Sequence, residues 1–190
     1  MRIAVIGTGN IGRTLGGRWR AAGHDVVYGS RSGTGDSPDG APLDSIAGAL
    51  DGADVVLLAV PGGAVAGLVG ANGAGLAGKV IIDAANRIGE PEFNSRAEVA
   101  KAAPGARYVR AFNTLGWENF AEPPAGAALF FAADPAARPV AEELISAVGL
   151  EPAYVGEAAA AGTVDALLPL WFALVKQNGG HRKLALRIVG

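Results

Sequence analysis

Cysteine is absent from this 190-residue chain, which excludes disulfides, thiolate catalysis and thiolate metal sites. Histidine occurs only at His24 and His181, and no carboxylate cluster lies near either, so we expect no metal site. Charge is also scarce: 18% of the residues are charged, the net charge is −2, and both signs are spread along the chain. No basic stripe or polybasic segment therefore predicts a nucleic-acid or membrane-surface partner.

Long apolar runs are missing as well, since no stretch of about 18 uncharged apolar residues exists. The N-terminal "RIAVIG" lacks the basic region and cleavage site of a signal peptide. We therefore expect a cytoplasmic protein with no membrane association. In contrast, half of the residues are hydrophobic and 29 are glycine, and the length suits one compact domain with a substantial core.

Short apolar runs alternate with Ala-rich stretches of helical character. The runs predict strands at 2–7, 24–29, 53–61, 79–86, 106–113, 128–133 and 151–156. Helices are expected at 10–23, 43–50, 63–76, 95–104 and 135–148. The strands are continuously apolar, which is typical of a parallel sheet covered by helices on both faces.

This alternation predicts an α/β doubly wound (Rossmann) fold with a mostly parallel sheet. We assign residues 1–156 to a nucleotide-binding domain. Residues 157–190 form a C-terminal helical segment that packs on the active site or in a dimer interface. This segment reads as two helices with a break near Gly179-Gly180, and "LLPLWFALV" (167–175) is apolar nearly all round, which predicts burial.

Glycines 7, 9 and 12 form a G-x-G-x-x-G motif where the first strand meets the first helix. Gly7 permits a tight turn, Gly9 lets the backbone approach a pyrophosphate, and Gly12 lets the helix pack closely on the strand. The amides at the start of the helix carry partial positive charge, which favours phosphate. The context of strand, loop and helix therefore predicts a dinucleotide site.

The second strand ends in "VVYGSRSG", where an acidic residue is expected in NAD-binding proteins. Ser30 lies 18 residues after Gly12, and Arg31 follows it. A guanidinium suits the 2′-phosphate of NADP, whereas an acid would repel it. Ser30, Arg31 and Ser32, with the Gly33 amide as a further donor, therefore predict NADP rather than NAD; Asp36 and Asp39 further along the loop are the contrary signal.

The nicotinamide end is expected near the third, fourth and fifth strands. Small or polar residues follow these strands: Ala59, Val60 and Pro61, then Ala84 and Asn86, then Asn113 and Thr114. Apart from Lys176, no general acid or base stands out, so we assign no catalytic side chain. Hydride transfer between two flat redox rings needs stacking and water exclusion rather than a proton donor, and the sequence agrees with that chemistry.

Four segments, "MRIAVIGTGNIG", "VVYGSRSG", "DVVLLAVP" and "VRAFNTLG", together with the C-terminal "TVDALLPLWFALVKQNGG", resemble the NADPH-dependent deazaflavin (coenzyme F-420) reductases, or F-420-dependent NADP oxidoreductases. The chain also resembles the cytosolic domain of six-transmembrane metalloreductases, which pass hydride from NADPH to a flavin. The resemblance implies NADP(H) as cofactor, a deazaflavin or FAD/FMN as the small-molecule redox acceptor, and a homodimer formed through the C-terminal helices.

The resemblance also assigns roles to residues. It implies that Thr8, Gly9, Asn10 and Ile11 hold the pyrophosphate, and that Ser30 and Arg31 hold the 2′-phosphate. It places Val60 and Pro61 beside the nicotinamide, and lines the deazaflavin pocket with Asn113, Thr114 and Leu115. The chain departs from the reductases in lacking further basic residues after Arg31, and in having Asn113 where a His commonly precedes the Thr.

Two alternatives stay open. The first is an NADP-dependent β-hydroxyacid or imine-type reductase with Lys176 as the proton donor, although Lys176 also suits a helix end before a glycine cap. The second is a non-catalytic NADPH-binding or sensing module, which the missing acid and base would equally explain.

Overall fold

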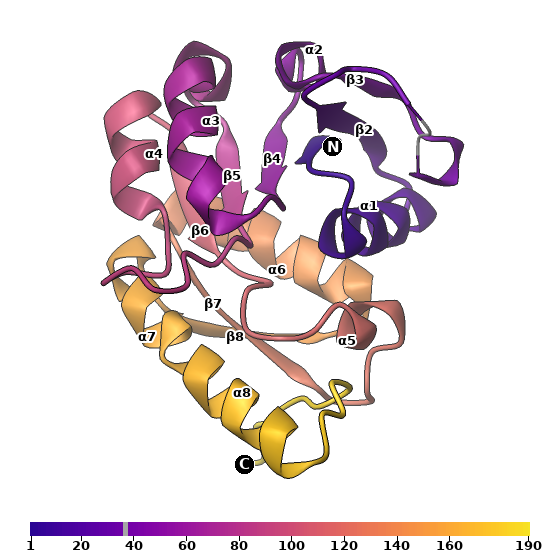
Figure 1. Cartoon of the computed structure of the whole chain (residues 1–190), viewed down its shortest axis with the longest axis vertical. Coiled ribbons are helices and arrows are strands. Elements are labelled where there is room, and N and C mark those ends of the chain that lie inside the picture. The colour runs from indigo at the N-terminus through magenta and orange to yellow at the C-terminus, as the bar shows by residue number, and fades with distance from the viewer. Residues whose placement is uncertain (36–37) are drawn as a thin grey trace.

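A computed structural model describes residues 1–35 and 38–190, and it has one eight-stranded sheet in the order β3-β2-β1-β4-β5-β6-β7-β8 (Figure 1). Every neighbouring pair is parallel except β6 and β7, which are antiparallel. The predicted doubly wound, mostly parallel fold is therefore confirmed. The strands are β1 (Arg2–Ile6), β2 (Asp25–Ser30), β3 (Leu43–Ser45), β4 (Val55–Leu58), β5 (Val80–Asp83), β6 (Arg107–Arg110), β7 (Ala128–Ala133) and β8 (Glu151–Gly156).

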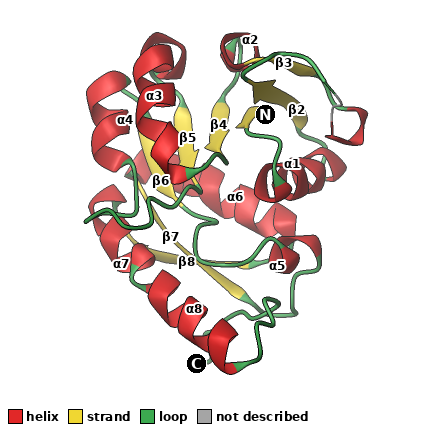
Figure 2. Ribbon diagram, in the orientation of Figure 1, coloured by secondary structure: helices red, strands yellow, loops and turns green. Residues whose placement is uncertain are grey.

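Helices cover both faces of this sheet (Figure 2). They are α1 (Asn10–Ala21), α2 (Ile46–Leu50), α3 (Gly62–Leu76), α4 (Arg96–Ala102), α5 (Glu118–Ala121), α6 (Arg138–Val148), α7 (Ala161–Asp165) and α8 (Leu167–Gln177). Three single 3-10 turns complete the described elements, at Pro38–Gly40, Pro135–Ala137 and Ala158–Ala160.

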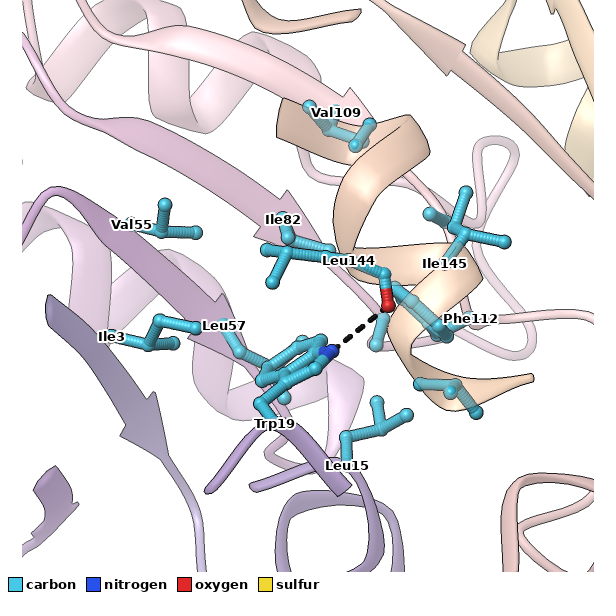
Figure 3. Packing of buried hydrophobic residues seen from close by; sticks show 14 of the residues in the cluster. Ile3, Leu15, Trp19, Val55, Leu57, Ile82, Val109, Phe112, Leu144 and Ile145 are labelled. Carbon is cyan, nitrogen blue, oxygen red and sulfur yellow. Dashed lines mark hydrogen bonds between the residues drawn. The ribbon is translucent and has the colours of Figure 1, made fainter. Parts of the chain in front are cut away.

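One face of the sheet packs against α1 and α6 (Figure 3). Leu15 and Trp19 of α1 meet Leu144 and Ile145 of α6 over alternate strand residues such as Ile3. The indole Nε1 of Trp19 donates a 3.0 Å hydrogen bond to the carbonyl of Leu144, so this large ring is buried with its polar atom satisfied. The contact joins two helices that lie far apart in the sequence.

The opposite face packs against α2, α3 and α4. Val65 and Val69 of α3 and Val99 of α4 are buried there over Ala4 and Ile6, the strand residues that alternate with those of the first face. Because both faces are covered, the central strands β1, β4 and β5 are buried at nearly every position, which is the reason for the continuous apolar runs in the sequence.

The structure differs from the sequence prediction over 43–50. These residues are not one helix, because Leu43–Ser45 forms the edge strand β3 and only Ile46–Leu50 is helical. The Oγ of Ser45 accepts a hydrogen bond from the Gly48 amide at 3.1 Å and caps α2. A three-residue edge strand depends on pairing with β2, and no periodic pattern in three residues reveals it.

The C-terminal segment also differs. The two helices are separated at Ala166 rather than near Gly179-Gly180, and no described residue after Gln177 is helical. Residues 181–190 instead form an irregular segment, in which the carbonyl of Leu186 accepts a 2.8 Å hydrogen bond from the Ala128 amide at the start of β7. We call residues 181–187 the C-terminal strap.

The apolar helix α8 is only partly buried, contrary to the burial predicted for 167–175. Leu168 and Trp171 face inward, while Leu170 and Phe172 are each 47% exposed. The helical stretch Ala158–Gln177 has a mean hydropathy of 1.7, which by length and composition alone is enough to cross a membrane. One helix of this kind is weak evidence for a membrane span, because a buried core helix of a soluble protein passes the same test; here 39% of the most apolar 18-residue window is buried.

Candidate functional site

The strand order reverses between β1 and β4, and the loops that follow these two strands meet there. The chain runs outward through β2 and β3 on one side and through β5 and β6 on the other. In doubly wound sheets, this reversal opens a crevice beyond the carboxyl ends of the strands, where nucleotides bind. The glycine loop after β1 therefore lies at the position that such a fold reserves for a dinucleotide.

The three motif glycines differ in what surrounds them. Gly7 has a φ of +114°, and a Cβ there would collide with the Ala59 carbonyl. A Cβ on Gly12 would collide with the carbonyl of Gly7, so helix and strand pack closely only because this side chain is missing. Gly9 has no atom within 4 Å of its hypothetical Cβ. Its open side is the feature expected where a pyrophosphate approaches the backbone.

Helix α1 begins directly after this loop. Gly9 is its N-cap, no side chain caps it, and its first turn contains no acidic residue. The first amides of α1 are therefore available to an anion. Arg13 adds a positive charge beside the loop. Its position is fixed there because its Nε donates a 2.6 Å hydrogen bond to the Thr8 carbonyl. The residues predicted to hold the pyrophosphate, Thr8 to Ile11, all lie at this turn.

The residues predicted to hold a 2′-phosphate lie at the neighbouring strand end. The amide of Gly7 donates to the carbonyl of Gly29 at 3.2 Å, which places the end of β2 beside the glycine loop. Ser30 Oγ accepts a 3.1 Å hydrogen bond from the Gly33 amide, so this amide, expected as a ligand donor, is engaged in the turn. Arg31 is exposed and makes no ion pair or hydrogen bond within residues 1–35 and 38–190.

The serines of this turn are partly engaged with one another. Ser32 Oγ donates to the Thr34 carbonyl at 2.8 Å and lies 3.4 Å from Ser30 Oγ. Of the two acids in the loop, Asp36 lies outside the described residues. The backbone of Asp39 is fixed to α1, since its main-chain carbonyl accepts a 2.6 Å hydrogen bond from Arg20 Nη1. Among the described residues of this turn, Arg31 has side-chain donors that no hydrogen bond or ion pair uses.

A cleft of about 380 Å³ extends from the glycine loop toward β4 and β5. It brings together eight of the predicted cofactor residues, and four others that the sequence analysis did not include. The predicted residues in its wall are Gly9, Asn10, Ile11, Ala59, Val60, Pro61, Ala84 and Asn86, and the additional ones are Gly62, Ala85, Trp117 and Arg182. The apolar stretch Ala59–Pro61 forms a wall against which a flat ring can lie.

Asn86 is held by two neighbours at the β5 end of this cleft. Its Oδ1 accepts a 2.8 Å hydrogen bond from Arg110 Nη2, and its Nδ2 donates at 2.8 Å to the carbonyl of Asn113. The Nδ2 of Asn113 in turn donates to Asp165 at 3.1 Å, while its buried Oδ1 has no described partner. The amide of Asn86 is thus fixed in orientation, and one buried acceptor remains on Asn113.

A buried ionic cluster lies behind these two amides. Arg110 is fully buried, with Nε 2.7 Å from Asp165 and Nη1 3.4 Å from Asp83. Burial raises the pKa of Asp83, although Arg110, the Tyr108 hydroxyl and the amides of Ser95 and Ala85 oppose that shift. Burial, and then the charge of Asp83, raise the pKa of Tyr108 well above its usual value. The cluster joins β5, β6 and α7 below the floor of the site.

None of the three residues predicted to line an acceptor pocket, Asn113, Thr114 and Leu115, is among the residues that line the cofactor cleft. Thr114 and Leu115 line a separate apolar cavity of about 100 Å³ beneath α8, together with Phe130, Trp171 and the strap. They do not line the cofactor cleft as described. Lys176 lies exposed in the last turn of α8 and is not among the residues that line the cleft. This position is the one expected of a lysine that ends a helix.

The family description "NADP oxidoreductase coenzyme F420-dependent" matches residues 2–87, the part of the chain that contains the glycine loop and the Ser30-Arg31 turn. A hypothetical protein of Sinorhizobium meliloti is 30% identical, with a TM-score of 0.71 over all of this chain and 96% of its own. A protein of Arthrobacter sp. FB24 described as a "putative f420 dependent nadp-reductase" is 26% identical, with a TM-score of 0.84 over the whole of both chains.

The chain belongs to the family of coenzyme F420-dependent NADP oxidoreductases.

Membership of this family agrees with the geometry of the cleft and confirms the resemblance drawn from the motifs. The protein is accordingly an NADP-dependent oxidoreductase, with NADP(H) as its cofactor. The open side of Gly9, the uncapped helix and the free donors of Arg31 fit such a dinucleotide. The cofactor supplies the hydride chemistry, and the residues of the chain bind and orient it.

Solved structures with lower sequence identity share the fold. An imine reductase of Bacillus cereus is 15% identical, with a TM-score of 0.68, and this chain spans 93% of itself but only 61% of that enzyme. This likeness extends to the fold alone.

Trp117 and Arg182 were missed by the sequence analysis for different reasons. Trp117 follows β6 by a few residues, so an aromatic residue in a loop at the carboxyl edge was a usable signal. Arg182 is far along the chain and reaches the cleft only because the strap folds back over α5. No local pattern around Arg182 points to the site.

Proposed function

We propose that this soluble NADP-dependent oxidoreductase transfers hydride between NADP(H) and a planar acceptor of the deazaflavin (coenzyme F-420) or flavin type. The observation that carries this proposal is the composition of the cleft wall. Beyond the glycine loop, the wall is formed by small apolar residues, the amide of Asn86, the indole of Trp117 and the guanidinium of Arg182. None of the lining residues is a carboxylic acid, histidine, tyrosine or lysine.

Reduction of a carbonyl or an imine usually requires a proton donor close to the reacting atom. Hydride exchange between two flat rings requires stacking at short distance and exclusion of water. The apolar wall at Ala59–Pro61 and the indole of Trp117 offer surfaces for two rings. The family description, which names coenzyme F420, supports the deazaflavin as the first acceptor to test.

The decisive experiment is a spectroscopic assay. The protein is mixed with NADPH and with F-420, FMN or FAD in turn, without oxygen, and the absorbance of each acceptor is followed. We expect bleaching of at least one acceptor in step with loss of NADPH absorbance. Absence of turnover with every deazaflavin and flavin would contradict the proposal.

A second assay tests the Lys176 alternative. If the protein were an imine-type reductase, Lys176→Ala would abolish reduction of a cyclic imine by NADPH. We expect no imine reduction by the wild-type protein, because Lys176 lies outside the cleft wall.

We also propose that the protein acts in the cytoplasm as a homodimer joined through α8. The exposed Leu170 and Phe172 lie on the outer side of this helix, beside the exposed Pro169 and Ala173. An apolar helix face of this kind is stabilised when a second copy covers it. The family resemblance of the C-terminal segment supports the same arrangement.

A further inference from the structure

The C-terminal strap is anchored at several points over the loop that follows β6. The Arg182 carbonyl accepts a 2.9 Å hydrogen bond from Asn119 Nδ2, and the Leu184 carbonyl accepts a 3.0 Å bond from Trp171 Nε1. Lys183 pairs with Glu122, and the Leu186 carbonyl is bonded to β7. These contacts hold the strap against α5, α8 and β7, and they place one of its residues in the wall of the cofactor cleft.

That residue is Arg182, the one cation among the cleft-lining residues. Its Nε lies 3.0 Å from Glu118 Oε1, and its guanidinium carbon lies 5.0 Å from the centre of the Trp171 ring. These contacts orient the guanidinium. Within the described part of the chain, no hydrogen bond uses its two terminal amino groups, and its side chain is 45% exposed.

Hydride transfer creates charge at this end of the cleft. A C–H bond of the dihydronicotinamide breaks with both electrons, and a new bond to hydrogen forms on the acceptor ring. The nicotinamide becomes cationic, and the acceptor ring gains one negative charge. In the absence of a proton donor in the cleft wall, a fixed cation is the available means of stabilising that ring as the charge develops.

We propose that Trp117 and Arg182 form the acceptor subsite, in which the indole stacks on the planar ring and the guanidinium stabilises the negative charge that the ring gains. Arg182 is thereby a catalytic residue that replaces a general acid, and the ring takes its proton later from water. The inference rests on the proposed function and deepens it. It restricts the acceptor to a heterocycle that is stable as an anion after it receives hydride.

The test compares Arg182→Ala with wild type, using riboflavin and FMN as acceptors. The two share one ring and differ in the phosphate of the side chain. We expect kcat to fall by about tenfold with both, below the effect of losing a fully buried oxyanion donor because Arg182 is partly exposed and paired. The Kd of NADPH should not change, and Arg182→Lys should recover most of the rate.

A binding measurement separates charge stabilisation from a structural effect. Arg182→Ala should weaken binding of the reduced, anionic ring more than binding of the oxidised ring. Arg187→Ala is the control, because Arg187 is an exposed arginine of the same strap that does not line the cleft. Thermal unfolding of each variant verifies that the strap has not detached.

Each outcome has a defined meaning. A loss confined to FMN would overturn the proposal, since it would show recognition of the phosphate rather than of the ring. Unchanged kcat with both acceptors, or an equal loss in Arg187→Ala, would also overturn it while leaving the proposed function intact. If wild type turns over no flavin or deazaflavin, the proposed function itself fails, and this inference falls with it.

Discussion

The Nε of Arg110, on β6, lies 2.7 Å from Oδ1 of Asp165, on α7, and both side chains are buried. The two residues are 55 positions apart in the sequence, and their contact connects the C-terminal helices to the carboxyl edge of the sheet. Arg110 also holds Asn86, and Asp165 also holds Asn113 and Asn94. This pair therefore links the floor of the cofactor cleft to the segment that carries α8 and the strap.

Removing the charge of Asp165 should therefore destabilise the fold strongly. Asp165→Asn leaves Arg110 buried with only the more distant Asp83 carboxylate, and breaking a buried pair in this way costs about 3–5 kcal/mol. Urea unfolding measures the loss. The matched control is Glu142→Gln, which breaks the exposed Arg138–Glu142 pair at 2.8 Å and should cost less than about 1 kcal/mol. Equal losses in the two variants would contradict the role of the cluster.

Alanine substitutions at two glycines should separate ligand binding from folding. Gly9→Ala places a methyl group in open space, so stability should be nearly unchanged while NADPH affinity falls, because the pyrophosphate needs that space. Gly12→Ala drives a methyl group into the carbonyl of Gly7 and should lower the unfolding midpoint. Calorimetric titration and thermal unfolding measure the two effects. NADPH binding at wild-type affinity in Gly9→Ala would argue against the proposed position of the pyrophosphate.

Cofactor selectivity should depend on Arg31. We expect Arg31→Ala to weaken NADPH binding by about 1.5–3 kcal/mol, the range for a lost hydrogen bond to a charged group, and to leave NADH binding nearly unchanged. Arg138→Ala, which removes an exposed arginine on α6, is the control for a general effect of charge. Equal losses for NADPH and NADH would refute contact between Arg31 and the 2′-phosphate.

The stability of the protein should fall at high pH through Tyr28. Burial, together with the nearby charge of Asp39, raises the pKa of Tyr28 to about 12, although Arg20 and Arg13 oppose the shift. Because the folded pKa exceeds the usual 10.0, the folded state holds this proton more tightly, and the resulting stability is complete below pH 10. It should be lost as the pH rises toward about 12, as monitored by unfolding at several pH values.

The Tyr28→Phe variant tests that assignment. It should show a smaller decrease in stability between pH 10 and about 12, and the remaining decrease should come from Tyr108, whose pKa is also raised. An unchanged pH dependence in Tyr28→Phe would assign the effect to other groups.

The α8 face should control the oligomeric state. Introducing charge with Leu170→Glu and Phe172→Glu should convert the proposed dimer into a monomer. The free energy of removing a carboxylate from water in an apolar interface is not compensated by a partner charge or hydrogen bond. Light scattering after size-exclusion chromatography measures this. NADPH binding should persist, since neither residue lines the cofactor cleft. Lys176→Glu, at an exposed position of the same helix, is the control, and a monomeric wild-type protein would refute the dimer.

Much of the structure of the nucleotide-binding region could be predicted from local sequence patterns. Short stretches of sequence encode the glycine loop, the strand ends and the covered sheet, because a tight turn or a buried strand restricts the residues within it. The edge strand β3 was missed because its three residues depend on β2 for pairing. The second C-terminal helix predicted after Gly180 was wrong, because residues 181–187 find their bonding partners on α5, α8 and β7 instead.

The sequence by itself determined the doubly wound fold and the dinucleotide loop, because glycines and apolar runs act over a few neighbouring residues. It also supplied the basis for predicting an NADP-linked cofactor, since a guanidinium at the end of β2 attracts a phosphate that an acid would repel. Only the tertiary structure decided that Arg110 and Asp165 would be buried together, and that Trp117 and Arg182 would line one cleft. Such long-range contacts arise from the packing of whole elements, and no spacing along the chain encodes them.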